Sequence, residues 1–223
     1  LCMTQGLSTG SMLPQLQMAA KHDFGVVVIN TNSRSYVNPD TGEKHLIVGS
    51  ERPEAHALYM WEHFVVPSAA RNFFVMGYGY GGEVTRTLLA SLAKMRTEER
   101  AVARSAGGAD ADAAYRAEES SEDKLSPMAS SFDRIAGIAL IESSHQVDPS
   151  KEHPSVVKMC NDKMVNWRSS YQAKGYRIEN DDSMSKRRKR QGCLCISSGD
   201  CGSNVAASIR KVLKEIFNFY AIA

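Results

Sequence analysis

Apolar residues along the chain alternate between short continuous runs and longer stretches in which they recur every three or four positions. Four short, mainly apolar runs cover positions 24–29, 72–76, 134–141 and 193–197, and the first of them is rich in β-branched residues. A short run without polar alternation is typical of a strand that is buried on both faces. We therefore predict four strands of a parallel sheet that is covered by helices.

Helical spacing of the apolar residues predicts helices between these runs, at positions 11–20, 53–64, 83–96, 155–169 and 205–220. The last helix has the clearest pattern, because seven apolar residues from Val205 to Tyr220 line one of its faces. Strands and helices alternate along the chain, which predicts an α/β fold with right-handed crossovers. The expected architecture is a three-layer sandwich with a mainly parallel sheet.

The length of 223 residues suits a single domain over positions 1–223. Residues 97–131 are rich in Ala, Ser, Glu and Asp and contain almost no large apolar side chains, so we expect a disordered or loosely helical insertion there. Polar loops are expected around positions 38–42 and 180–192. Because the chain starts at Leu1 without a signal-peptide pattern, we expect an excised domain of a longer protein.

Composition narrows the function classes. A net charge of +2 gives no overall basic surface, so the total charge does not argue for nucleic-acid binding. The five cysteines are sparse and odd in number, which favours a reducing compartment over a disulfide-built secreted domain. No apolar run is long enough to cross a bilayer, and we expect no membrane partner.

The turn at positions 77–82 carries the strongest functional signal. It reads Gly-Tyr-Gly-Tyr-Gly-Gly between a predicted strand and a predicted helix. This frame matches the G-x-S-x-G elbow on which α/β-hydrolases mount their nucleophile, with Gly79 in the place of the serine. The degenerate elbow of Gly77, Gly79 and Gly81 therefore predicts a hydrolase-like scaffold without its reactive atom.

Two other interpretations of this turn remain open. Gly77, Gly79 and Gly82 also spell the G-x-G-x-x-G of a dinucleotide site, which requires an acidic residue at the end of a second strand roughly 20 residues later. Glu98 and Glu99 lie near that distance, but at the tail of a predicted helix. Alternatively, the glycines only allow close packing of strand and helix.

The other strand ends supply a candidate pocket but no complete triad. A hydrolase needs its histidine in the last loop, and residues 198–203 contain none. Catalysis by a serine triad is therefore not expected, although His145 with Ser143 could form a weak hydrolytic pair or the pocket could bind a small molecule. The candidate pocket residues are Asn30, Tyr78, Tyr80, Glu142, Ser143 and His145.

Two further clusters have competing interpretations. Cys193, Cys195 and Cys201 could bind zinc, but their spacing lacks paired C-x-x-C knuckles, and buried thiols are the simpler interpretation, so we expect neither metal nor cofactor. The run Lys186, Arg187, Arg188, Lys189 and Arg190 could be a nuclear-import signal, a nucleic-acid patch or a solvated loop.

Several segments in order resemble the Arb2 domain family, named after an Argonaute-binding protein. They are residues 10–14 (GSMLP), 24–30 (FGVVVIN), His56, Tyr59 and Trp61, residues 77–85 (GYGYGGEVT), 141–145 (IESSH) and 196–199 (ISSG). The resemblance spans nearly the whole chain except residues 97–131 and the basic loop.

This resemblance implies an α/β-hydrolase relative that is used mainly for protein interaction in RNA silencing and chromatin repression. We therefore expect a non-catalytic, nuclear interaction domain, present in the cytoplasm as well. Its expected partners are Argonaute-associated or histone-related proteins, with nucleic acid as a further partner of the basic loop. Gly79 at the elbow and the missing histidine near Ser203 depart from an enzymatic pattern.

Overall fold

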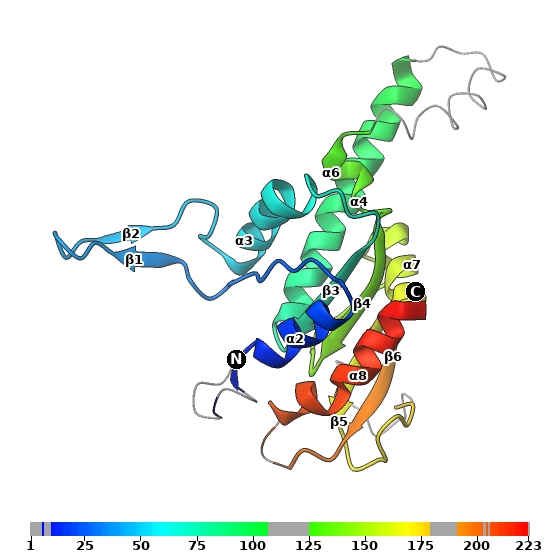
Figure 1. The fold of residues 1–223 in the computed structure, drawn as a ribbon. Coiled ribbons are helices and arrows are strands. Elements are labelled where there is room, and N and C mark those ends of the chain that lie inside the picture. The colour runs from blue at the N-terminus through cyan, green and yellow to red at the C-terminus, as the bar shows by residue number, and fades with distance from the viewer. Residues whose placement is uncertain are drawn as a thin grey trace. The chain divides into compact units, whose positions relative to one another are not determined.

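The computed structural model of the protein describes residue 6 and residues 10–106, 125–178, 191–202, 204 and 206–222 (Figure 1). The chain folds into two compact units. Unit 1 comprises residues 1–28, 73–86 and 136–223, and unit 2 comprises residues 29–72 and 87–135. The units are interleaved along the sequence, and the single domain expected over 1–223 stays a prediction.

Unit 1 is built around a four-stranded parallel sheet with the strand order β3–β4–β5–β6. Its strands are β3 (Phe73–Tyr78), β4 (Ile135–Ile141), β5 (Met164–Ser169) and β6 (Leu194–Gly199). In register, Ile138 of β4 lies opposite Met164 of β5, and Asn166 of β5 lies opposite Cys195 of β6. Every residue of β4 is buried, as its unbroken apolar run predicts.

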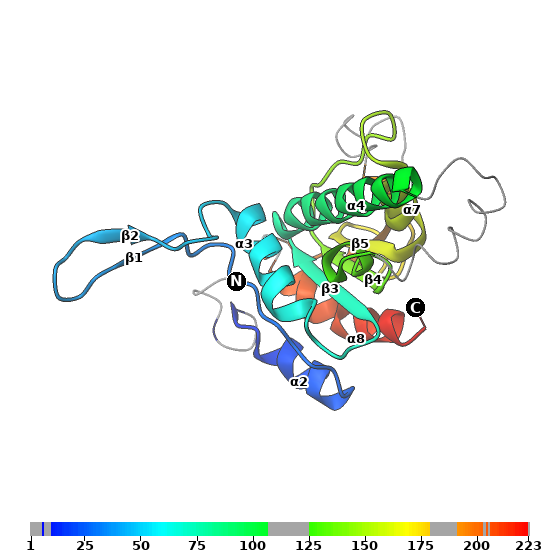
Figure 2. The same cartoon turned by 90° about the horizontal axis from the view of Figure 1, so that it is seen from above.

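Helices cover both faces of this sheet (Figure 2). α2 (Leu13–Lys21) and α8 (Ala207–Ile222) lie on one face, and α7 (Pro154–Lys163) and the first turns of α4 (Gly81–Ala106) lie on the other. The apolar stripe of α8 packs on β4 and β5 in a cluster that includes Ile141, Trp167 and Phe217. This arrangement confirms the predicted three-layer α/β class.

Unit 2 contains an antiparallel hairpin and a short helical cluster. The hairpin pairs β1 (Ser35–Val37) with β2 (Lys44–Leu46), where only a polar loop was expected. α3 (Pro53–Met60) runs on into the π-helical turn η2 (Trp61–Val65), and α6 (Pro127–Ser130) follows later. Inside the cluster, Trp61 Nε1 donates to Ser131 Oγ at 2.9 Å, and the Arg134 guanidinium donates to the carbonyls of Val66, Ser68 and Ala70.

The strand predicted at positions 24–29 is wrong. Among the described residues, no backbone hydrogen bond involves positions 25–29, and Val26, Val27 and Val28 are between 43% and 49% exposed. Phe24 at the start of the segment is anchored, because its ring packs edge-on against Phe74. A β-branched run favours an extended backbone, but it becomes a strand only where a neighbouring backbone bonds to it.

The helix predicted at 155–169 also needs correction. α7 ends at Lys163, and Met164 begins β5 without an intervening residue. The prediction failed because no glycine or proline separates the two elements. Val165 and Trp167 are two positions apart, which is the spacing of one face of a strand, and in the structure they alternate with Met164 and Asn166 along β5.

A disordered or loosely helical insertion was expected over 97–131, and both of its described ends are ordered. α4 continues to Ala106, and Glu99 on this helix accepts hydrogen bonds from the N–H and hydroxyl of Ser126, both at 2.7 Å. Ala129 and Ser131 are fully buried. Low apolar content did not prevent order here, because polar side chains cap and pair locally. Residues 107–124 lie outside the described residues.

Candidate functional site

The glycine-rich turn lies at the carboxyl end of β3, where the strand passes into α4. Gly79 has a φ of +55°, a left-handed conformation that glycine adopts at little cost. Its N–H donates to the Ile141 carbonyl at 2.9 Å, and its own carbonyl accepts from the Gly82 N–H at 3.2 Å. A Cβ added to Gly79 would meet no atom within 4 Å. The turn thus has the shape of a nucleophile elbow, with open space where the side chain would project.

Replacing Gly79 with serine should be sterically possible but destabilising. We expect Gly79→Ser to lower the free energy of unfolding by about 1–3 kcal/mol, because a side chain strains the backbone at this φ. Gly79→Asn should cost less, since asparagine tolerates left-handed backbone better. Urea unfolding of both variants measures the difference. Gly79→Ser should remain unlabelled by a fluorophosphonate probe, and strong labelling would show that the scaffold still supplies a base.

Gly77 and Gly82 serve close packing. A Cβ on Gly82 would lie 1.8 Å from Ser143 Oγ, and a Cβ on Gly77 would lie 2.9 Å from Leu140 Cδ2. The first turn of α4 therefore rests directly on the end of β4. The close-packing interpretation holds for these two glycines, whereas Gly79 is explained by its backbone conformation.

Ser143 and His145 form a buried pair beneath this contact. Ser143 Oγ lies 2.8 Å from His145 Nδ1, and each residue is only 1% exposed. The imidazole also bonds to the Gln191 backbone, so we assign Nε2–H as donor to that carbonyl and Nδ1 as acceptor of the serine hydroxyl. Burial lowers the pKa of His145 to about 4, which keeps the ring neutral near pH 7.

Amide side chains complete a closed network around this pair. Asn166 Nδ2 donates to the Ser143 carbonyl at 3.0 Å and to Gln191 Oε1 at 2.8 Å. Gln191 Nε2 donates to the same Ser143 carbonyl at 3.1 Å, and the Cys195 thiol donates to Gln191 Oε1 at 2.8 Å. The network ties the end of β4 to the middle of β5 and to the start of β6. Because Ser143 and His145 are buried, they stabilise this edge of the sheet and do not face a substrate from solvent.

Glu142 precedes the pair and has the unusual φ of +52° for a residue with a side chain. Its carboxylate accepts from the Ser169 N–H, and a hydrogen bond from Ser208 adds to this. Burial nevertheless raises the pKa of Glu142. The carboxylate therefore joins the end of β4 to the end of β5 and to the start of α8.

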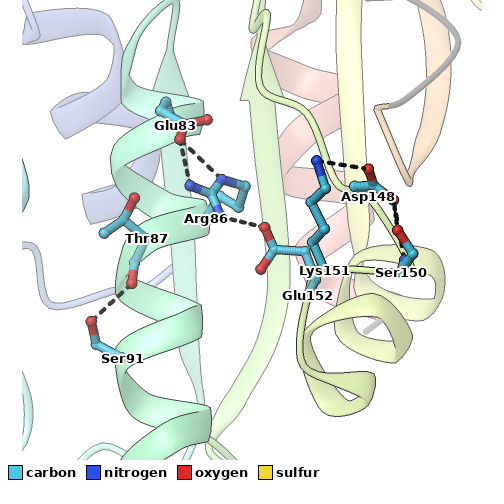
Figure 3. A network of polar contacts seen from close by, with 8 residues as sticks. All are labelled: Glu83, Arg86, Thr87, Ser91, Asp148, Ser150, Lys151 and Glu152. Carbon is cyan, nitrogen blue, oxygen red and sulfur yellow. Dashed lines mark hydrogen bonds and ion pairs between the residues drawn. The ribbon is translucent and has the colours of Figure 1, made fainter.

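An ion-pair network holds the first turn of α4 to the loop before α7 (Figure 3). Arg86 donates to Glu83 Oε1 through Nε at 3.0 Å and Nη2 at 2.6 Å, and its Nη1 reaches Glu152. The Glu83 hydrogen bonds are the main reason that the pKa of Arg86 is raised, against the opposing effect of burial. These ion pairs hold the start of α4, the helix that follows the elbow, against the loop before α7.

Five of the six predicted pocket residues belong to unit 1. Tyr78 and Tyr80 flank Gly79 and are 37% and 59% exposed, and Glu142, Ser143 and His145 lie below the turn in the same unit. Asn30 belongs to unit 2, where its side chain bonds locally to Ser33. The pocket as a whole stays a prediction.

The other candidate chemistries gain no support. Glu98 and Glu99 both lie on α4, the helix that begins at the elbow, so the second strand of a dinucleotide site does not precede them. Among the described residues, no three His, Cys, Asp or Glu side chains are grouped as a metal site, and no helix is long and apolar enough to span a membrane. The basic run 186–190 lies outside the described residues.

One family model, the Arb2 domain, matches residues 1–119, a range that includes the elbow. The chain belongs to the Arb2 domain family. The matched range contains the elbow and all elements from α2 to α4.

Curated relatives of this Arb2 domain include cotranscriptional regulators. The "Cotranscriptional regulator ARB2A homolog" of Gallus gallus is 23% identical over 37% of this chain and 31% of its own length. "Cotranscriptional regulator ARB2A" of Homo sapiens is 22% identical over 37% and 31%, and the Dictyostelium discoideum homolog is 27% identical over 40% and 30%. The Arb2 domain chain thus spans about a third of the length of these relatives. No solved structure matches it.

Sequence reasoning missed several residues that build this Arb2 domain site. The sequence pattern predicts a helix where β5 lies and so gives no signal for Asn166, and Gln191 carries no motif. The Glu83–Arg86 pair was detectable from its i, i+3 spacing on a predicted helix. Glu152 has no such signal, because its partner is 66 positions away.

Proposed function

We propose that this Arb2 domain is a non-catalytic protein-interaction domain of a nuclear complex that regulates transcription or chromatin through RNA silencing or histone-related partners. The observation that carries the proposal is the elbow: its backbone is kept, while its tip has open space and no side chain. A catalytic function would require a reactive group at that position. The names of the cotranscriptional relatives support a regulatory role.

Burial of the neighbouring hydroxyl and imidazole also supports this proposal. In the rival weak hydrolase, Ser143 would have to reach a substrate, yet it is packed under Gly82 and bonded to His145. The exposed groups at the turn are instead Tyr78 and Tyr80. Tyrosines are enriched in protein interfaces, because they bury a large area and keep a polar end. We therefore assign the partner contact to these two tyrosines.

Affinity purification from nuclear extract, followed by mass spectrometry, tests this assignment. We expect the wild-type chain to enrich subunits of transcription or chromatin complexes, and the double variant Tyr78→Ala, Tyr80→Ala to lose them by tenfold or more. Tyr171→Ala is the matched control, because Tyr171 is 97% exposed in the same unit and lies outside the elbow. Both variants should keep the wild-type melting temperature.

Three results would count against the proposal. The first is equal recovery of partners by the double variant, and the second is equal loss in Tyr171→Ala. The third is turnover of an ester substrate that disappears in Ser143→Ala. Import is tested separately, because alanine at Lys186–Arg190 should abolish nuclear accumulation without changing partner binding in vitro if the run is only an import signal.

A further inference from the structure

A hollow between the end of α2 and the middle of α8 is not used by the proposed function. Both helices lie on the same face of the sheet in unit 1 (Figure 2). The hollow has a volume of about 290 Å³, and five residues line it: Met18, Lys21, His22, Lys214 and Asn218. Met18 is half-buried and the other four are exposed, so the hollow is open to solvent.

Packing between α2 and α8 holds the walls of the hollow in place. His22, the residue after α2, packs at a tilt of 31° on Phe217 of α8, with the ring centroids 5.3 Å apart. The N–H groups of His22, Asp23 and Phe24 donate to three carbonyls in the last turn of α2. These carbonyls are therefore satisfied by the backbone, without the Lys21 ammonium.

The charges around the hollow are unbalanced. α2 and α8 together contain four lysine or arginine residues and one glutamate. That glutamate, Glu215, is paired with Lys174 at 2.5 Å. Within the part of the chain that the structure describes, Lys21, Lys214 and Asp23 form no ion pair. Two ammonium groups therefore line one hollow without a carboxylate bound to either of them.

The donors at the hollow fit a phosphoryl group better than a carboxylate. Lysine ammonium groups bind phosphate as point charges, and the Asn218 amide and an imidazole N–H of His22 are further donors. A phosphate monoester carries a charge of about −1.5 to −2 and three acceptor oxygens, whereas a carboxylate carries one charge and two oxygens. A ligand that contacts both ammonium groups therefore matches the phosphate monoester.

Exposure of the hollow indicates that this phosphoryl group belongs to a larger molecule. Sites for free small molecules bury roughly 70–90% of the ligand surface. A small ligand in this hollow would stay largely in water, because four of its five lining residues are exposed. We propose that the hollow binds a phosphorylated side chain of a partner protein, with Lys21 and Lys214 contacting the phosphate. This inference rests on the proposed function, in which the partners are proteins, but it uses none of the elbow residues.

NMR titration of the isotope-labelled full chain with the capped peptide Ala-Ala-phosphoserine-Ala-Ala tests the proposal. We expect the amide resonances of the lining residues to shift and to saturate in the millimolar range, because a single phosphoryl contact supplies little binding energy. The matching peptides with serine or glutamate in place of phosphoserine should bind at least tenfold more weakly. This measurement on the wild type does not depend on the folding of a variant.

Removal of the two ammonium groups identifies the residues that contact the phosphate. The double variant Lys21→Gln, Lys214→Gln should bind the phosphopeptide tenfold or more weakly, whereas Lys214→Arg keeps the charge and should retain binding. The matched control is Lys94→Gln, Lys158→Gln, which makes the same change in net charge at two exposed lysines that do not line the hollow. The control should bind as the wild type does.

The proposal is overturned if no lining residue responds to the phosphopeptide, if the glutamate peptide binds as tightly, or if the control variant loses as much affinity. It is also overturned if inorganic phosphate binds tenfold more tightly than the phosphopeptide, because the ligand would then be a free anion. The double variant Tyr78→Ala, Tyr80→Ala should bind the phosphopeptide as the wild type does. Failure at the hollow and failure of the elbow contact therefore give different results.

Discussion

Replacing Gly82 with alanine is expected to be among the most damaging single-methyl changes in this protein. The added Cβ would lie 1.8 Å from Ser143 Oγ and 2.6 Å from Ser143 Cβ, so either α4 or the end of β4 must move. Overpacking of this kind costs about 1–3 kcal/mol. Displacing Ser143 would also break its 2.8 Å contact with His145. We therefore expect urea unfolding of Gly82→Ala to show a decrease in the free energy of unfolding at the upper end of that range.

Gly81→Ala is the matched control, one residue earlier on the same helix. A Cβ at Gly81 meets no atom within 4 Å, and the residue does not have positive φ. Alanine should leave the free energy of unfolding unchanged or raise it by about 0.4–1 kcal/mol, because it reduces the conformational entropy of the unfolded chain. If Gly81→Ala and Gly82→Ala were equally stable, the contact between Gly82 and Ser143 would not be as close as described.

Acidification is expected to destabilise the folded chain through His145. Its pKa is lowered from 6.5 to about 4 in the folded state, so the folded chain binds fewer protons than the unfolded chain between these values. The stabilisation from neutral His145 is complete above pH 6.5 and is lost as pH falls. A pKa shift of this size lowers the free energy of unfolding by about 3 kcal/mol at pH 4, relative to its value above pH 6.5. Urea unfolding at several pH values measures this slope.

Comparison with His145→Gln isolates the histidine from other titrating groups. Glu142 acts in the opposite direction, because its pKa is raised and protonation on acidification favours the folded state. The variant keeps Glu142 and should have a flatter pH dependence between 6.5 and 4. His63→Gln, which changes an exposed histidine of unit 2, should keep the wild-type slope. An unchanged slope in His145→Gln would contradict the assignment.

The sequence predicts the helices, the strands and the elbow better than it predicts which segments contact one another. β4 was predictable because its unbroken run of seven residues fits a buried strand. α8 was predictable because its single apolar stripe fits a helix. The elbow was predictable because strand, glycines and helix occur in a fixed order. Residues 24–29 have the same composition as a buried strand, but pairing depends on a neighbour that local composition does not specify.

The candidate site shows the same limit. Ser143 and His145 were identified from the turn that follows β4, and their proximity follows from their spacing. Their burial was not predictable, because it results from Gly82, Asn166 and Gln191, which come from three other segments. Hydrogen bonds between residues 25 to 48 positions apart leave no periodic signal in a single sequence.

The direct junction of α7 and β5 has a consequence for insertions and deletions. Most helices and strands are joined by loops that absorb a change in chain length. Here Lys163 ends the helix and Met164 begins the strand opposite Ile138. One additional residue at the junction would move each following side chain of β5 to the opposite face or force the helix to unwind. The length of this segment is therefore constrained more tightly than its sequence.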